Sequence, residues 1–471
     1  MKKKEFENLE SIVLKGRKKL SKEQKKIIAN EIKKIKEKIE KLEKDLLKYG
    51  RLLDYNELKE KGFSIEKINE FSIRDVGVVD FADQIMNSHK DDHDYMFGYP
   101  ANMIENSAVT KYLRWLESQM FFTNSCGNAY GQGNYRMNNA IQELMIIDRI
   151  KENLGLNSED YWGYITMGGT EGNMWGIREG FSKYKDGILY YSDSAHYSVA
   201  KVADMKSPDK YVTIPSKQEK IDTEELLTTI VKNYKEKGAP AILLLTFGTT
   251  TFGSIDDIDL INKVLDEYQI PHYIHVDAAL YGGIPKNQIN SPINKMKAIA
   301  DSEIDSISVS LHKYLGNQRT NGVLLSKSKS YQKFIDYIGN QDITFLGSRD
   351  FPTFSILQQI DELYNRSNPE EYIKNIKTFE RLLNENEIPY IKGEENGNIF
   401  VIENPGDEIC KKYQLATFTK DGNDYAHIIV FPYHQEDKIK ELVNDIKTVK
   451  NKDYGDDHPK LRRKVKWIKL K

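Results

Sequence analysis

Cysteine is scarce in this sequence. Its 471 residues include two cysteines, Cys126 and Cys410, and neither has neighbours at a spacing typical of a metal site. Disulfide scaffolds and cysteine-based zinc sites both need several cysteines at short spacing, so the sequence predicts neither. We expect no metal site and a reducing, cytoplasmic setting for the protein.

Long hydrophobic runs and a strong net charge are also lacking. The longest apolar runs, such as AILLL at 241–245, are far shorter than the roughly 20 residues that cross a bilayer. The basic start, MKKKEFENLE, contains no apolar segment of a secretory signal. The formal net charge of −2 gives no reason to expect a nucleic acid or an anionic membrane as partner. With 39% hydrophobic and 30% charged residues, the composition is that of a soluble globular protein.

Proline is absent from the first fifty residues, which are dense in lysine and glutamate. Ser21 to Gln24 has the form of a capping box, and the apolar residues after it alternate steps of four and three, from Ile28 to Leu46. The pattern predicts one long helix with a narrow apolar stripe that ends near Gly50. Such a helix either forms a coiled coil with a partner or packs on its own protein or its dimer mate, and the sequence leaves both open.

Short apolar strands alternate with longer helical stretches from about residue 76 to 330. A helix is expected over 255–268, for instance, between two of the strands. Strands alternating with helices predict right-handed crossovers and a mostly parallel sheet. The expected strands are 162–167, 188–192, 241–247, 272–279, 306–310 and 321–326.

The pattern changes after about residue 352. A helical stretch over 354–386 is followed by apolar strands at 398–404 and 426–433 and a last helix near 435–449. We therefore predict an N-terminal helical extension (1–75), a large α/β domain (76–352) and a small C-terminal α+β domain (353–471).

In open α/β sheets, ligands bind beyond the carboxyl ends of the strands. The strand 162–167 runs into Gly168-Gly169-Thr170-Glu171-Gly172 and then a helix. Such a turn aims backbone N–H groups and a helix dipole at an anion, typically a phosphate. It has neither the Walker spacing nor a GxGxxG pattern, so an ordinary tight turn is the competing interpretation.

Two further strand ends carry titratable residues. His196 follows the strand 188–192, where it has either a structural or a functional role. Asp277 ends the apolar strand that begins at 272, and a buried carboxylate is costly unless a cation pairs with it. Asp277 therefore forms an internal salt bridge, caps a helix or binds a cationic ring nitrogen. In the last case Ala279 is small enough for a flat ring to lie close.

The strand SISVS at 306–310 leads into Leu311-His312-Lys313. Ser310 and His312 can donate hydrogen bonds to a phosphate. A buried lysine flanked by cations has a lowered pKa and can form an imine. The four strand ends together supply what pyridoxal 5′-phosphate needs: a phosphate turn, a residue that stacks on the ring, an acidic partner for the ring nitrogen and an imine lysine.

With these residues in place, the sequence resembles the group II pyridoxal-phosphate-dependent decarboxylases, in particular their histidine decarboxylase and serine decarboxylase branch. The resemblance runs from FGYPANM (97–103) to about residue 445 and rests on motifs in the family's order. These motifs are GYITMGGTEGNMWG, YYSDSAHYSVAK, TFGTTTFGSIDDI, YIHVDAAL, SISVSLHK and DITFLGSRD. It implies a fold-type I, transferase-like architecture with a mostly parallel, seven-stranded large domain and a smaller C-terminal domain.

The resemblance implies a role for each strand-end residue. Lys313 would form the internal aldimine, Asp277 would pair with the pyridinium nitrogen, and His196 would stack on the ring. These three are the expected catalytic residues. The remaining expected cofactor contacts, most of them to the phosphate, are Gly169, Thr170, Thr249, Thr250, Ala279, Ser310 and His312.

The implied reaction is decarboxylation of an L-amino acid to an amine and CO₂ through aldimine and quinonoid intermediates, with histidine or a serine-like polar substrate favoured. His196, Lys313 and Tyr337 are candidates for the proton donor to Cα. In the family the segment matching 342–349 reaches into the neighbouring subunit's active site, which implies a homodimer. The expected substrate contacts are Tyr99, Asn102, Asn124, Leu311, Thr344 and Ser348.

The sequence departs from the family pattern near the expected substrate site. Leu311 stands where the branch usually has glycine, GSRDFP replaces a pattern ending in Asn-Gly-His, and NSCGNAYGQGNYRMNN (124–139) matches only loosely. These differences leave the substrate open. They also leave two other classes open: another pyridoxal-phosphate enzyme (a lyase, an aminotransferase or an oxidative deaminase), and a non-catalytic relative or nucleotide-binding protein.

Overall fold

The computed structural model describes residues 33–34, 92–104, 109, 111, 124–131, 133–135, 138–157, 159–300, 304–329, 332–350 and 353–453. The chain forms two units, Met1–Tyr95 and Met96–Lys471. In the first unit the described part comprises residues 33–34 and a 3₁₀ turn, η1 (Asp92–Tyr95). Almost all of the helix predicted over 21–50 thus lies outside the described residues.

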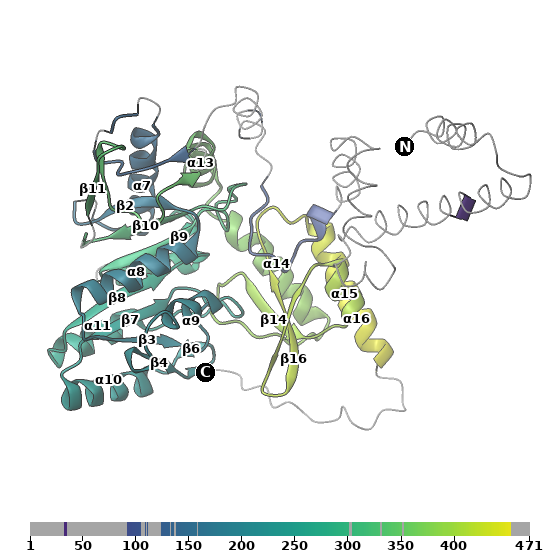
Figure 1. Cartoon of the computed structure of the whole chain (residues 1–471). Coiled ribbons are helices and arrows are strands. Elements are labelled where there is room, and N and C mark those ends of the chain that lie inside the picture. Colours follow the sequence, from purple (N-terminus) through teal and green to yellow (C-terminus); the bar gives the residue numbers. More distant parts are fainter. Residues whose placement is uncertain are drawn as a thin grey trace, which may run out of the picture. The chain divides into compact units, whose positions relative to one another are not determined.

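A seven-stranded sheet forms the centre of the second unit (Figure 1). β10 is antiparallel to both of its neighbours and the other strands run parallel to one another. All six predicted strands are present within two residues of the expected bounds, whereas β4 was not predicted. The order is β2 (Trp162–Thr166), β10 (Gly322–Ser326), β9 (Ser306–Ser310), β8 (His272–Asp277), β7 (Ala241–Thr246), β3 (Ile188–Ser192) and β4 (Tyr211–Ile214).

Helices connect the strands and cover the sheet. They are α7 (Ala140–Leu154), α8 (Gly169–Lys183), α9 (Tyr197–Ala203), α10 (Thr223–Lys237), α11 (Ile258–Glu267) and α12 (Met296–Ala300), with 3₁₀ turns η2 (Pro208–Lys210), η3 (Tyr281–Gly283) and η4 (Pro292–Lys295). Among the described residues, three two-stranded pairs lie outside the sheet: β1 (Asn124–Ser125) with β13 (Arg349–Asp350), β5 (Ser216–Lys217) with β6 (Lys220–Ile221), and β11 (Lys333–Ile335) with β12 (Asn340–Asp342).

Helix α8 lies unusually close to the sheet because glycines face it. A Cβ atom built on Gly172 would come within 2.1 Å of Ser308 Oγ, and one on Gly180 within 2.6 Å of Ile242. The small polar face of SISVS is therefore the face beneath α8, while Val309 points to the opposite side, where it meets η3 at Gly282. The serine alternation provides the space that a closely packed helix needs.

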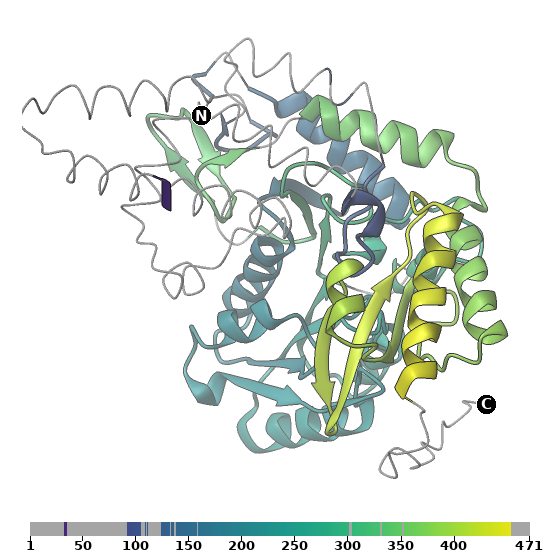
Figure 2. The ribbon, with the colours of Figure 1, turned by 90° about the vertical axis from the view of Figure 1, so that its right-hand side faces the viewer.

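The segment after residue 352 contains a second, three-stranded antiparallel sheet in the order β14 (Ile399–Glu403), β16 (Asn423–Ile429) and β15 (Ala416–Lys420). Figure 2 shows α14 (Glu371–Glu385) and α16 (Glu436–Asp453) side by side next to this sheet. Phe379 of α14 packs edge-on against Phe400 of β14, with ring centroids 4.9 Å apart. A short helix, α15 (Asp407–Lys412), links β14 to β15.

The single helix predicted over 354–386 is wrong in one respect. The structure has α13 (Thr353–Ile360), a π-helical turn η5 (Asp361–Arg366) and then α14, with an interruption at 367–370. Pro369 lies in this interruption, and a proline disfavours the helical conformation of the residue before it. The division of the chain into three domains stays a prediction.

Neither a membrane span nor a metal cluster is found in the part of the chain that the structure describes. No helix there combines the length and the apolar character needed to cross a bilayer. No group of three or more potential metal-ligating side chains lies together within those residues.

Candidate active site

Four strand ends meet at one edge of the seven-stranded sheet. β2, β9, β8 and β3 all run in the same direction, so the segments that follow them emerge on the same side. A Cβ on Gly169, after β2, would lie 2.9 Å from Ser310 Oγ and 3.6 Å from the Ala279 methyl group. The ends of β2, β9 and β8 are therefore in contact, as the strand-end argument predicted.

The turn after β2 forms the N-terminus of α8. Gly168 is the N-cap residue, with φ of 123°, and no side chain caps the helix. A Cβ on Gly168 would lie 3.8 Å from His312 Cε1. The first-turn N–H groups and the Ser310 hydroxyl are donors that fit a phosphate, and the His312 ring beside them can donate to it through Nε2 when the ring is protonated. Thr170 is exposed in the same turn.

Lys313 lies in the turn that follows β9 and is partly exposed. Burial lowers the pKa of Lys313, and the negative charge of Asp277 opposes that shift without cancelling it. A lowered pKa increases the fraction of neutral amine, which is the nucleophilic form. The main-chain carbonyl of Lys313 accepts hydrogen bonds from the N–H of Asn102 at 2.8 Å and of Gly316 at 3.1 Å.

Asp277 is 5% exposed at the end of β8. Its Oδ2 accepts a hydrogen bond from the Asn173 amide at 2.7 Å, and its Oδ1 accepts one from the Ala279 N–H at 3.1 Å. The negative charge of Asp277 acts on the pKa of both Lys313 and His196. The carboxylate is thus held in place by two donors and lies within electrostatic range of both candidate catalytic bases.

His196 is the N-cap residue of α9, and its Nδ1 accepts a hydrogen bond from the Ser198 N–H. Because Nδ1 accepts this bond, the neutral ring carries its proton on Nε2. Burial lowers the pKa of His196; Asp277 raises it, and the positive charges of Lys313 and Lys201 lower it further. His196 is therefore a neutral, fixed imidazole with an available N–H.

The predicted threonines lie after β7, the neighbour of β8. The N–H of Phe247, at the end of β7, donates to the carbonyl of Asp277 at 2.8 Å, which ties this loop to the site. Thr249 is buried, and its hydroxyl accepts a hydrogen bond from Ser254 N–H at 3.0 Å. Thr250 is exposed. The hydroxyl of Thr249 already closes a turn, whereas that of Thr250 faces solvent.

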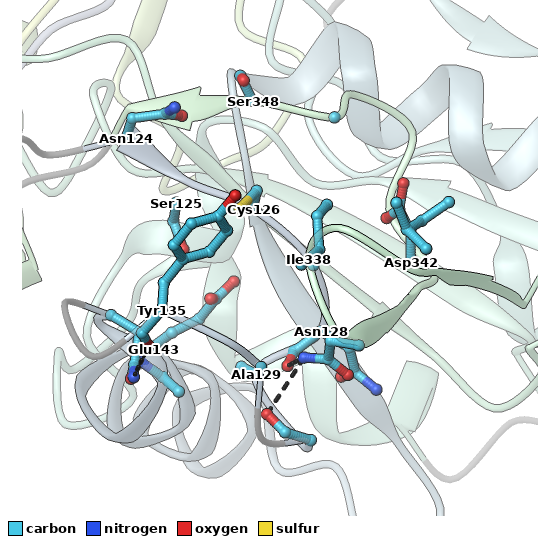
Figure 3. A pocket seen from close by; sticks show the side chains of 18 of the residues that line it. Asn124, Ser125, Cys126, Asn128, Ala129, Tyr135, Glu143, Ile338, Asp342 and Ser348 are labelled. Carbon is cyan, nitrogen blue, oxygen red and sulfur yellow. Dashed lines mark hydrogen bonds between the residues drawn. The ribbon is translucent and has the colours of Figure 1, made fainter.

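The structure divides the expected substrate residues into two groups. Asn102 contacts the Lys313 turn, and Leu311, in that turn, is fully buried. Asn124 and Ser348 instead line a cavity of about 700 Å³ beside β1 and β12 (Figure 3). Neither Lys313, Asp277 nor His196 lines that cavity.

The remaining predicted residues lie near this cavity or on the surface. Tyr337, a candidate proton donor, is 74% exposed and lines the cavity. Thr344 is buried, and its hydroxyl donates to Asp342 Oδ1. Tyr99 is 55% exposed. Within this one chain, Tyr337 is thus not part of the strand-end cluster.

Two polar residues next to Asp277 were missed by the sequence analysis. Asn173, on α8, and His275, on β8, are both buried and form a hydrogen bond with each other. A signal was present: Tyr273, His275 and Asp277 alternate along β8, which places three polar tips on one face of a buried strand. Only the packing of α8 shows that this face carries a hydrogen-bond chain.

Comparison with known proteins identifies the family of the chain. The model of the pyridoxal-dependent decarboxylase conserved domain matches residues 183–358. The chain is 30% identical over 362 residues to a histidine decarboxylase of Pseudomonas entomophila, covering 74% of this chain and 85% of that protein. It is 31% identical over 361 residues to serine decarboxylase 1 of Oryza sativa subsp. japonica, covering 74% of this chain and 71% of that protein.

Solved structures share the fold. A single-residue mutant of L-methionine decarboxylase from Streptomyces sp. 590 superposes with a TM-score of 0.66 at 19% identity, covering 83% of this chain and 96% of that one. Oryza sativa TDC, solved with PLP and tryptamine, gives a TM-score of 0.67 at 14% identity, covering 93% of this chain and 100% of that one. The prediction of a fold-type I α/β architecture is confirmed.

The chain belongs to the pyridoxal-dependent decarboxylase family. It is an amino-acid decarboxylase that uses pyridoxal 5′-phosphate, of the kind that includes histidine and serine decarboxylases.

Proposed function

We propose that Lys313 holds the cofactor through an imine, that Asp277 pairs with its ring nitrogen and that His196 lies on its ring face. The observation that carries this proposal is the convergence of three strand ends, from β9, β8 and β3, beside an uncapped helix N-terminus. The phosphate is held by the N-terminal turn of α8 with residues at the end of β9. Its proposed contacts are Gly169, Thr170, Ser310 and His312.

Bound pyridoxal phosphate supplies an electron sink that accepts the electron pair left on Cα when the carboxylate departs as CO₂. The protein's own groups prepare this step. Lys313 would hold the cofactor, and because burial lowers the pKa of Lys313, a larger fraction of its amine is neutral and nucleophilic. Asp277, fixed by Asn173 and the Ala279 N–H, keeps a proton on the ring nitrogen and so maintains the sink. His196 keeps its proton on Nε2 because its Nδ1 accepts the Ser198 N–H.

A polar L-amino acid, histidine or a serine-like one, is the proposed substrate. The support comes from the relatives at 30–31% identity, which are named histidine and serine decarboxylases. Leu311, which directly follows β9, is fully buried, so its side chain takes up space at the end of this strand without facing solvent. We further propose a cytoplasmic homodimer in which the cavity lined by Asn124, Ser348 and Tyr337 faces the partner's site.

The test is a screen of the twenty amino acids with the purified holoenzyme, in which CO₂ release is recorded and the product is identified by mass spectrometry. We expect an amine from histidine or serine. A keto acid or aldehyde as the main product would replace decarboxylation with another reaction of the same cofactor.

The role of Lys313 is tested by borohydride reduction followed by peptide mapping. We expect the reduced cofactor on Lys313 and no labelling in Lys313→Ala. Lys183→Ala is the matched control. Lys183 forms an ion pair with Asp305 over 2.8 Å, and Asp305 directly precedes the start of β9, at the opposite end of that strand from Lys313. Labelling of another lysine in the wild-type chain would overturn the assignment.

A further inference from the structure

A continuous chain of buried side chains leads to Asp277. Asn173 joins Asp277 to His275: its amide nitrogen lies 2.7 Å from Asp277 Oδ2, and its Oδ1 lies 3.0 Å from His275 Nε2. His275 Nδ1 lies 2.7 Å from Ser306 Oγ, which is 2.8 Å from the Tyr273 hydroxyl. All five residues are at most 5% exposed, so water does not compete for these bonds.

The donor and the acceptor of each hydrogen bond in this chain can be deduced by starting from Asp277. The Asp277 carboxylate only accepts, so Asn173 donates through Nδ2 and its Oδ1 is the acceptor that faces His275. His275 must then donate through Nε2–H. Burial lowers the pKa of His275 to about 4, so the ring is neutral and its Nδ1 carries no proton. Ser306 therefore donates to Nδ1.

The last bond is fixed by the same reasoning. The Ser306 hydroxyl has one proton, which His275 accepts, so Tyr273 donates to Ser306. Every donor in the chain points toward the carboxylate. Hydrogen bonds aligned in this way polarise and strengthen one another, and each is electrostatically stronger in a buried site than in water.

The close approach of α8 makes this chain possible. A Cβ on Gly176 would lie 2.2 Å from His275 Nδ1, so any larger residue there would displace the imidazole. Gly172 and Gly180 occupy the same helical face at spacings of four. The helix can therefore lie against β8 and bring Asn173 into reach of Asp277.

We propose that Asn173 and His275 are positioning residues that hold Asp277 ionised and oriented toward the cofactor's ring nitrogen. This inference rests on the proposed role of Asp277. Neither residue needs to touch the substrate. Their contribution is transmitted through Asp277 Oδ2, while Oδ1 is oriented separately by the Ala279 N–H.

The test uses the holoenzyme of two variants, Asn173→Leu and His275→Phe, which remove the hydrogen bonds while keeping similar volumes. We expect the dissociation constant of pyridoxal phosphate to rise about 10- to 100-fold in Asn173→Leu, as for loss of one hydrogen bond to a charged group, and about 10-fold in His275→Phe. With cofactor labelled with ¹⁵N in the ring, the NMR signal should move toward that of the unprotonated nitrogen. The kcat should fall while the KM changes little.

His272→Phe is the matched control. His272 begins the same strand, and its two ring nitrogens bond to the Ile270 carbonyl and to Asn262 Oδ1, remote from Asp277. We expect this variant to keep the wild-type cofactor affinity and ring-nitrogen signal. If His272→Phe and His275→Phe lose cofactor affinity and ring-nitrogen protonation equally, the effect of His275 is one of strand packing in general, and the proposal is overturned.

Asp277→Ala separates this inference from the proposed function. If Asp277→Ala retains wild-type affinity and ring-nitrogen protonation, the proposed role of Asp277 fails. If it loses both while Asn173→Leu and His275→Phe retain them, only the positioning role fails.

A second measurement is made on the wild-type protein. In the wild-type holoenzyme labelled with ¹⁵N-histidine, with His275→Phe used only to assign the signal, we expect His275 to be neutral at pH 7 and protonated on Nε2. A ring protonated on Nδ1 would contradict the deduced donor directions and overturn the proposal, whatever the cofactor affinity of the two variants.

Discussion

The backbone N–H of Asn102 donates to the main-chain carbonyl of Lys313 over 2.8 Å, and its side-chain amide donates to the next carbonyl, that of Tyr314, over 3.0 Å. These two bonds fix the turn that carries Lys313 to a segment more than two hundred residues earlier in the chain. Gly316 completes the contact, because a Cβ there would lie 2.1 Å from the Asn102 carbonyl oxygen. Asn102 therefore orients the lysine turn, besides any contact it makes with substrate.

Asn102→Ala should reduce kcat because the turn that presents Lys313 loses a hydrogen bond. It should also destabilise the fold by about 1–3 kcal/mol, since the buried Tyr314 carbonyl is left without its donor. Steady-state kinetics and urea unfolding of the holoenzyme check both effects. Asn386→Ala is the control, because it removes the same kind of bond, to the Leu382 carbonyl at 2.8 Å, at the end of α14.

A rise in KM with unchanged kcat in Asn102→Ala would point instead to direct substrate binding by this residue. That outcome would favour the role that the family resemblance implied for Asn102.

A buried ion pair anchors the segment that ends in GSRD. Arg349 and Glu143 are each 1% exposed and 2.7 Å apart, and Arg349 also donates to the carbonyls of Ile165 and Gly127. Glu143→Gln leaves a buried guanidinium without its counter-charge, and we expect a loss of about 3–5 kcal/mol in the free energy of unfolding. Urea denaturation gives the value.

The surface pair Arg381–Glu385, each about half exposed at 53%, provides the control for that measurement. Glu385→Gln should cost at most about 1 kcal/mol. The double variant Glu143→Leu/Arg349→Met should be more stable than Glu143→Gln, because it removes both buried charges together. Equal stability of Glu143→Gln and wild type would show that the pair is not buried in solution.

His312 gives the site a dependence on pH. Its Nδ1 donates to the Asn321 carbonyl at 2.9 Å, so a neutral ring has no proton left on Nε2 for a phosphate. Burial lowers the pKa of His312; the Asn321 carbonyl raises it and Lys313 lowers it. A phosphate dianion beside the ring would raise this pKa, so cofactor binding should take up a proton at His312.

The sign of the pH effect follows from that shift. Because the pKa is higher in the bound state, affinity is favoured at low pH and is lost as the pH rises through the bound-state pKa. Calorimetry in buffers of different ionisation enthalpy measures the proton uptake, in the Lys313→Ala background to exclude proton steps of imine formation. His312→Gln keeps an uncharged donor and should take up fewer protons, with a flatter pH profile. Unchanged uptake would assign the proton to another group.

The sequence by itself determined six of the seven strands of the large sheet and the residues at their ends. Period-two alternation defined β9, and a glycine turn after β2, an aspartate at the end of β8 and a lysine after β9 followed from local pattern alone. Parallel strands end at the same edge of a sheet, so these local signals were enough to predict that the residues meet. The break at Pro369 also has a local signal, the proline itself, although a continuous helix was predicted there.

Only the tertiary structure decided what surrounds Asp277. Asn173 and His275 are separated by about a hundred residues, and their bond depends on how closely α8 approaches the sheet. That distance is set by glycines of the helix meeting serines of β9, which is a property of two surfaces in contact. The sequence could name the carboxylate, but its hydrogen-bond donors became identifiable only when helix and strand were packed together.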